Sequence, residues 1–131
     1  MTLPLYFYAG SPIGGTLTGA SFTFNGPVIN ATTVQGAIIF QVPPENDLVV
    51  STLGIKFGAI VGSPVIVATI ETLTSGRPSG TTVAGATATF TPTSANAMTF
   101  TAFDAAATPT LTKGTFYALR VAATTADGSN S

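Results

Sequence analysis

Residues 65–73 read VIVATIETL, and residues 76–80, which follow shortly after, read GRPSG. Val, Ile and Thr are stiff about χ1 and pack well on a pleated surface, so the first segment is typical of a β-strand. Gly and Pro interrupt regular structure and are common in turns. The sequence therefore predicts a strand over residues 65–73 that ends in a turn at residues 76–80.

Shorter alternating segments lie on both sides of this strand. In residues 53–59, Leu53, Ile55 and Phe57 share one face, whereas Lys56 lies on the other. Strict alternation of this kind indicates a strand with one buried face. Further strands are predicted at residues 20–24, 36–42, 86–90, 98–102 and 116–123.

The last of these strands fixes the expected fold class. It places Tyr117, Leu119 and Val121 inward and Arg120 toward water. The chain thus has about seven short strands separated by turn residues, and no segment has sustained helical periodicity. We expect an all-β protein, an antiparallel β-sandwich that is jelly-roll-like, with an extended N-terminal arm.

The expected domain limits follow from the ends of the pattern. Residues 20–123 form the sandwich, and the small polar residues 124–131 form a flexible C-terminal tail. Residues 1–19 combine an aromatic cluster with a Gly-rich segment and are interpreted as an arm that docks on the body or on a neighbouring copy. An ordinary first strand of the sandwich is the alternative. The predicted assembly interface consists of Leu5, Tyr6, Phe7 and Tyr8.

The composition is unusual in its charge. Only 7% of the residues are charged, and the formal net charge is −1, against roughly 25% charged residues in an ordinary soluble domain. Weak repulsion between copies favours self-association, so we expect a homo-oligomer. Four scattered basic residues cannot form a phosphate-binding stripe, which argues against a nucleic-acid partner. Residues 57–70 are too short and too interrupted to span a bilayer.

The residue types also limit the possible chemistry. The chain contains no His and no Cys, so Ser-His-Asp and Cys-His arrangements cannot form and zinc lacks its usual ligands. We therefore expect a non-enzymatic protein without a metal or another cofactor. Two carboxylate pairs are candidate exceptions. Glu45 and Asp47 could bind calcium but fit a solvated turn better, and a glycosidase pair of Glu71 and Asp104 would need both in one cleft, whereas alternation puts Glu71 on a polar strand face.

The aromatic residues are predicted to lie mainly in the core. The chain has no Trp, the strongest platform for stacking sugars. Tyr6 and Tyr8 are the aromatics expected at a surface, where packing between subunits is favoured over sugar stacking. The residues assigned to the core by alternation are Phe22, Phe24, Phe40, Phe57, Phe90, Phe100 and Phe116.

An ordered set of segments resembles a known group of proteins. Residues 53–58 (LGIKFG), 65–73 followed by 76–81 (GRPSGT), and 109–119 (PTLTKGTFYAL) resemble the β-sandwich, jelly-roll-like modules of bacteriophage virion proteins such as head decoration, head fibre and tail accessory proteins. The resemblance is a pattern of strands and turns and covers residues 36–123. It implies no catalytic residue, turns at Pro78, Gly80 and Gly114, and a core or corner position for Tyr117.

Three functions remain open from the sequence. The leading one is a virion structural protein, a capsid decoration or tail-associated module on the virion surface, with a major capsid or tail protein as partner and a trimer as the candidate homo-oligomer. An extracellular or cell-surface location is the alternative. The second is a module that binds carbohydrate, such as a host surface glycan, or a host receptor through loops 43–47 and 75–82, with Glu45, Asp47 and Arg77 as candidates. The third is a filament subunit that polymerises by strand donation.

Overall fold

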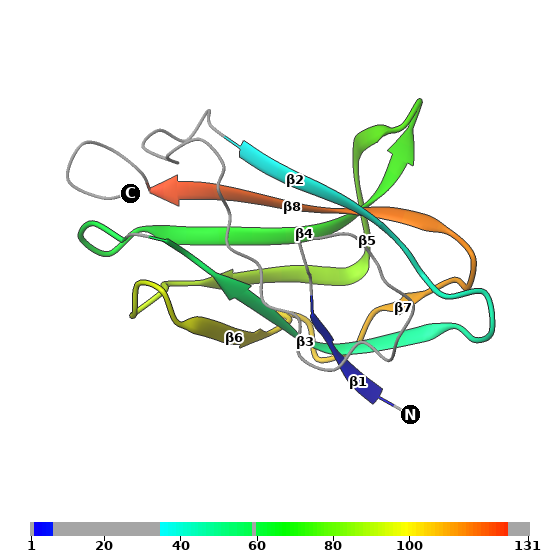
Figure 1. The fold of residues 1–131 in the computed structure, drawn as a ribbon, viewed down its shortest axis with the longest axis horizontal. Coiled ribbons are helices and arrows are strands. Elements are labelled where there is room, and N and C mark those ends of the chain that lie inside the picture. The colour runs from blue at the N-terminus through cyan, green and yellow to red at the C-terminus, as the bar shows by residue number, and fades with distance from the viewer. Residues whose placement is uncertain (1, 7–34, 59, 126–131) are drawn as a thin grey trace.

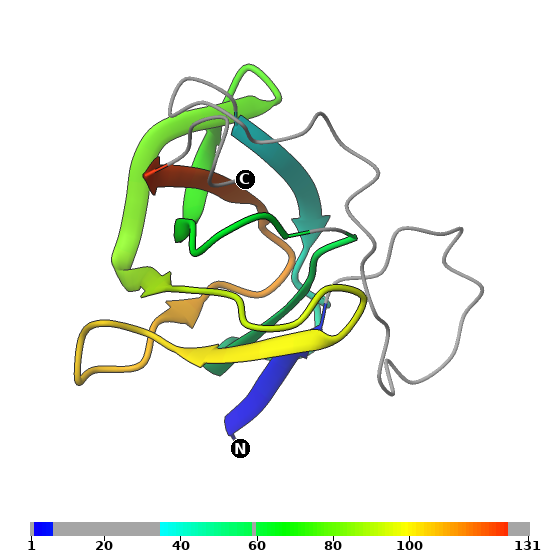
Figure 2. The same cartoon turned by 90° about the vertical axis from the view of Figure 1, so that its left-hand side faces the viewer.

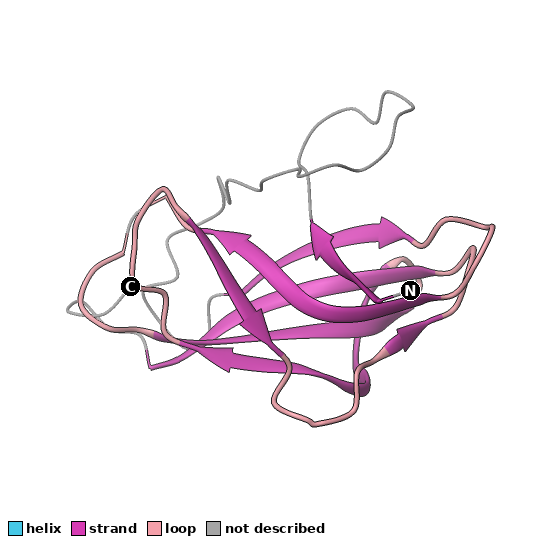
Figure 3. Cartoon of the chain, turned by 90° about the horizontal axis from the view of Figure 1, so that it is seen from below, coloured by secondary structure: helices cyan, strands magenta, loops and turns pink. Residues whose placement is uncertain are grey.

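The computed structural model describes residues 2–6, 35–58 and 60–125, and within them every regular element is a strand (Figures 1 and 3). The expected strand at residues 20–24, with Phe22 and Phe24, lies outside the described residues. The strands are β1 (Thr2–Tyr6), β2 (Gln35–Gln41), β3 (Leu48–Lys56), β4 (Val65–Thr74), β5 (Arg77–Phe90), β6 (Met98–Ala102), β7 (Thr110–Leu111) and β8 (Phe116–Thr125).

The strands form two sheets that pack as layers (Figure 2). The first sheet has the order β2-β8-β4-β5, and all its neighbours are antiparallel. The second has the order β1-β3-β6, and the short β7 also pairs with β3. The predicted all-β sandwich is confirmed.

The core lies between the sheets and is built from alternate residues of their central strands. In β4, Ile66, Ala68 and Ile70 are buried there because they share one face of the strand. In β8, Tyr117, Leu119 and Val121 are buried, which confirms the inward positions predicted from the sequence. The buried core consists of Val42, Val50, Leu53, Ile55, Ile66, Ala68, Ile70, Ala86, Ala88, Phe103, Leu111, Tyr117, Leu119, Val121 and Ala123.

Tyr117 occupies the core position expected of it and also fastens a loop. The residue is 6% exposed, and its hydroxyl accepts a hydrogen bond of 3.0 Å from the backbone N–H of Thr112. Gly114, in the same loop, has φ +69° and donates its N–H to the carbonyl oxygen of Val42. The expected turn at Gly114 is therefore present, and Tyr117 and Gly114 together fix the approach to β8.

Two of the predicted core aromatics are in fact exposed. Phe116 is 51% exposed and Phe100 is 56% exposed. Phe116 directly precedes the buried Tyr117, and neighbouring residues of a strand point to opposite faces. Phe100 pairs with Gly54, and its ring covers the space that a side chain at Gly54 would fill. Phe40, Phe57 and Phe90 pack against the core as predicted.

The turn between β4 and β5 is shorter than the sequence predicts. Only Ser75 and Gly76 lie between the strands, with φ of 51° and 73°, and Thr74 pairs with Arg77. Two residues with positive φ are the signature of a tight two-residue hairpin. The expected turn at residues 76–80 is therefore wrong, because Arg77 to Gly80 are already part of β5.

The tip of this hairpin bends away from the rest of the first sheet (Figure 1). The pairing of β4 with β5 shifts register on both sides of Glu71, and Gly80 and Gly85 have φ of 78° and 77°. Irregular pairing and left-handed residues bend a strand. The bend brings Gly80 over the outer face of the first sheet, where the candidate site described below lies.

The ends of the chain differ from the expected limits. Strand β8 includes Thr124 and Thr125, which the sequence assigned to the tail; the Thr125 hydroxyl accepts a hydrogen bond of 3.0 Å from Val65 N–H. Near the N-terminus, Thr2–Tyr6 pairs in parallel with β3. This part of the expected arm is thus an edge strand of the second sheet. No helix of the described residues has the length and apolar character needed to cross a membrane.

Candidate functional site

The candidate site is built around Glu71, a carboxylate with no exposed surface. Because Ile70 faces the core, Glu71 points to the outer face of the first sheet, as alternation predicted. The sequence predicts a polar strand face at this position. That face is covered, because the bent hairpin of β4 and β5 places Gly80 against the carboxylate.

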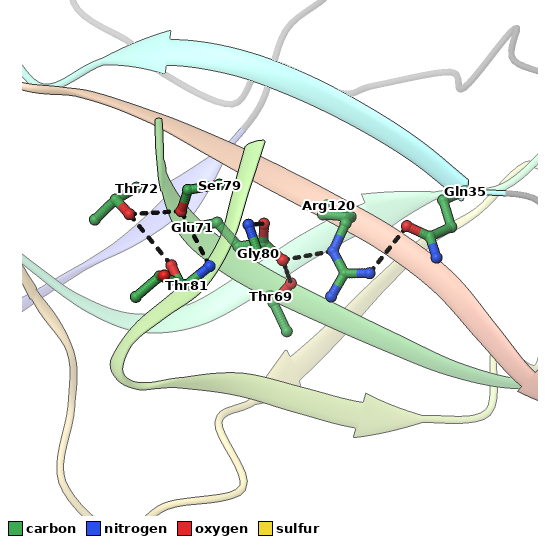
Figure 4. Close-up of polar contacts among 8 residues, drawn as sticks. All are labelled: Gln35, Thr69, Glu71, Thr72, Ser79, Gly80, Thr81 and Arg120. Atoms are coloured by element: carbon green, nitrogen blue, oxygen red, sulfur yellow. Dashed lines mark hydrogen bonds and ion pairs between the residues drawn. The ribbon is translucent and has the colours of Figure 1, made fainter. Parts of the chain in front are cut away.

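Three donors satisfy the buried carboxylate (Figure 4). One oxygen, Oε1, accepts hydrogen bonds from the Arg120 Nε–H and, at 3.1 Å, from the Thr69 hydroxyl. The other oxygen, Oε2, accepts the Gly80 N–H at 2.9 Å. Arg120 also donates from Nη1 to the side-chain oxygen of Gln35 at 2.9 Å. Side chains from β2, β4 and β8 and a backbone N–H of β5 therefore meet in one network.

The network keeps Glu71 ionised at neutral pH. Burial by itself would raise the pKa of this carboxyl group. The hydrogen bonds from Arg120, Gly80 and Thr69, together with the positive charge of Arg120, outweigh burial and lower the pKa below its ordinary value. An ionised Glu71 cannot act as a proton donor at neutral pH. It is suited instead to holding the charged guanidinium of Arg120 in place.

A groove of about 390 Å³ opens beside this network. Its lining includes Arg77 and Pro78 of the hairpin and Gln35 and Ala37 of β2. Arg77 is exposed, and within the described part of the chain its guanidinium has no hydrogen bond or ion pair. Since Glu71 neutralises Arg120, the described residues leave one positive charge of the groove uncompensated, that of Arg77.

The three residues predicted in surface-binding loops do not form one site. Arg77 lines the groove. Asp47 is engaged in fastening two loops, because its Oδ1 accepts the Lys113 N–H at 2.9 Å. Glu45 is exposed in the loop between β2 and β3 and does not line the groove.

The two carboxylates weighed as a glycosidase pair belong to separate hydrogen-bond clusters. Asp104 accepts the N–H and the hydroxyl of Thr89, at 2.8 and 2.7 Å, and thereby binds the edge of β5. Glu71 is enclosed by Arg120, Thr69 and Gly80. Both have structural partners, and neither is oriented toward the other by a shared contact.

The remaining predicted residues lie in or near β1. Leu5 is in register with Leu53, and Tyr6 is in register with Gly54. Phe7 and Tyr8 lie outside the described residues. Across residues 2–6, 35–58 and 60–125, no group of three acidic side chains gathers as a metal site would require.

The sequence reasoning missed Arg120 and Gln35 as members of a site. One signal was available: Glu71 and Arg120 are single charged residues within two apolar strands of a chain that is only 7% charged. Opposite charges in such positions favour pairing across neighbouring strands. Pairing could not be assigned without the strand order, which places β4 beside β8.

Neither a protein-family model, nor a curated protein, nor a solved structure matches this chain.

Proposed function

We propose that this protein is a non-enzymatic structural module of a virion surface, which assembles with copies of itself and with a capsid or tail protein. The resemblance of residues 36–123 to bacteriophage virion modules supports the location. A low charge supports the mode of action, since a protein held in an assembly does not need strong repulsion between copies.

The pairing of β1 with β3 is the observation that carries the assembly part of the proposal. Strand β1 is held at the edge of the second sheet in parallel register, from Thr2 opposite Val49 to Tyr6 opposite Gly54. The same backbone hydrogen bonds form whether the strand comes from the same chain or from a neighbour. Residues 7–34 separate β1 from β2 in the sequence, and an extended chain reaches roughly 3.3 Å per residue. That length allows exchange of β1 between copies.

Light scattering at several concentrations tests the assembly. The full chain is expected to form a discrete oligomer, and a variant without residues 1–6 is expected to be a monomer with an unchanged circular dichroism spectrum of the sandwich. A full chain that remains a monomer at every concentration would contradict the proposal. Growth to indefinite length would favour the filament alternative.

The virion location needs a separate test. An antibody raised against the purified protein should label the surface of intact particles from the virus that encodes the chain, as seen by immunogold electron microscopy. Particles that carry no label, although infected cells contain the protein, would contradict the location.

A further inference from the structure

Among the described residues, the groove beside Glu71 combines an unpaired cation, Arg77, with a paired one, Arg120. Arg120 is held in place because its Nε–H binds Glu71 and its Nη1 binds Gln35 (Figure 4). Arg77, which also lines the groove, is exposed and has no partner within the described residues. Glu71 cancels only one of these two charges, so the groove attracts an anion.

Arg120 and Gln35 keep hydrogen-bond donors that the network with Glu71 does not use. The Arg120 hydrogen bonds use the Nε–H and one N–H of Nη1, which leaves the second N–H of Nη1 and both N–H groups of Nη2. The Gln35 oxygen is already an acceptor, so its side-chain NH₂ remains. Glu71 has three donors of its own. A ligand for this groove must therefore bring acceptors, with a negative charge directed at Arg77.

The size and the rest of the lining narrow the class of ligand. A volume of about 390 Å³ lies at the lower end of the range of small-ligand sites, roughly 300–1,000 Å³. Ala37 and Pro78 contribute small apolar surfaces next to the polar groups. Apolar patches beside a few directed donors suit a sugar ring, whose C–H face is apolar and whose hydroxyls accept hydrogen bonds.

We propose that this groove binds one acidic sugar residue. The carboxylate of the sugar pairs with the Arg77 guanidinium, which is suited to bidentate binding of carboxylates. Its hydroxyl oxygens accept hydrogen bonds from Gln35 and from Arg120 Nη2, and its ring rests on Pro78. The site lies on the outer face of the first sheet, whereas β1 belongs to the second sheet, so this proposal stands independently of the assembly.

Titration of the full chain with sodium D-glucuronate, followed by NMR shifts of backbone amides, tests the proposal. Saturable shifts are expected at Gly36, Arg77 and Gly80. D-glucose is the matched neutral probe, because it differs from glucuronate only in having a CH₂OH group in place of the carboxylate, and it should bind at least about 10-fold more weakly. Equal binding of the two sugars would overturn the proposal.

Two variants with the same change in net charge separate the site from general attraction. Arg77→Gln should weaken glucuronate binding about 10-fold or more, because a charge-assisted pair is lost. Lys113→Gln, in the loop before β8 and outside the groove, should leave the affinity unchanged. Gln35→Ala provides a second test through a neutral donor and should also weaken binding.

Other outcomes would overturn the proposal in distinguishable ways. An equal loss of glucuronate affinity in Arg77→Gln and Lys113→Gln would mean that binding depends only on the net charge of the protein. Acetate binding as tightly as glucuronate would mean that the sugar ring contributes nothing and that an acidic side chain of a peptide would serve as well. Absence of saturable shifts in the wild-type chain would exclude the site, while leaving the assembly of the protein untouched.

Discussion

Glu71 is the residue whose environment departs most from that of an ordinary surface carboxylate. A buried charge is costly unless it is paired and hydrogen-bonded, and both oxygens of Glu71 meet this condition. Removing one partner of such a cluster lowers the free energy of unfolding by more than the whole cluster contributes to it. The reason is that the remaining charged or polar groups stay buried without a partner. Arg120 is 30% exposed and retains some solvation, which moderates the effect.

Glu71→Gln is expected to lower the free energy of unfolding by about 2 kcal/mol at pH 7. Because the pKa of Glu71 is lowered in the folded protein, its contribution is complete above its ordinary value of 4.5 and is lost as the pH falls through the folded-state pKa. The difference between wild type and variant should therefore shrink below pH 4.5. Urea unfolding of wild type and variant at pH 7 and at pH 3 measures the loss of stability and its decrease at low pH.

The exposed Glu45 supplies the control for this change. Glu45→Gln removes the same charge without breaking the network, and it should change the stability by less than about 0.5 kcal/mol. A destabilisation by Glu71→Gln that stays constant from pH 7 to pH 3 would contradict the account of an ionised, stabilising carboxylate.

Gly85 provides a second prediction at the residue scale. A Cβ atom there would lie 2.9 Å from the carbonyl oxygen of Ala107, and φ is +77°. Gly80, in the same strand, has φ +78° but open space around a Cβ atom. Gly80→Ala should cost about 1 kcal/mol from backbone strain, and Gly85→Ala about 1–3 kcal/mol more from the clash. Thermal unfolding measures both losses of stability. Equal losses in the two variants would show that the loop at Ala107 moves aside without an energetic penalty.

The position of Glu71 shows how far alternation predicts a site. The period of two correctly assigns Glu71 to the face opposite Ile70. It cannot predict that the hairpin folds over that face, because the bend depends on left-handed glycines and register shifts between two strands. Gly80 was expected in a turn for the same φ > 0, but it lies in a strand and donates to the carboxylate.

At the scale of elements, the connection after β6 ties the two sheets together. Asp104 follows β6 of the second sheet, and its carboxylate binds Thr89 at the edge of β5 in the first sheet. Its backbone N–H also donates to the Thr87 carbonyl oxygen at 2.8 Å. Three hydrogen bonds thus close one side of the sandwich.

Asp104→Ala should destabilise the fold by about 1 kcal/mol and expose the Thr89 amide to faster hydrogen exchange. The side-chain acceptor of that amide is removed, whereas the backbone bond to Thr87 remains. Glu45→Ala serves as the comparison, since it removes an exposed carboxylate from a different loop. Unchanged exchange at Thr89 would contradict the role of Asp104 as a link between sheets.

Strand positions were predictable to the extent that one face of each strand is buried. Residues 98–102 are strand β6 as expected, and Tyr117, Leu119 and Val121 point inward. The first nine residues of β5 were missed because Arg77, Pro78 and Gly80 have the chemistry of a turn. They form a strand because Ser75 and Gly76 alone complete the hairpin.

At the scale of the whole molecule, the sandwich carries little charge, and β1 pairs in parallel with β3 at one edge of the second sheet. The composition favours association, but it does not predict which edge a partner strand uses. The register between β1 and β3 could not be read from the sequence, because strand order and pairing depend on contacts distant along the chain. The structure shows β1 on β3 of its own chain, and the proposal is that the same pairing joins neighbouring copies.

Disulfide trapping tests this claim most directly, because the chain contains no Cys. In the double variant Thr2→Cys, Val49→Cys the two cysteines are opposite each other in the β1–β3 register, so a disulfide can form between them after mild oxidation. The single variants control for chance contacts. If, as proposed, β1 of one copy pairs with β3 of the next in the register seen within this chain, the double variant will give covalent oligomers on a non-reducing gel. A double variant that oxidises completely yet runs only as a monomer would place both strands in one chain and contradict the claim.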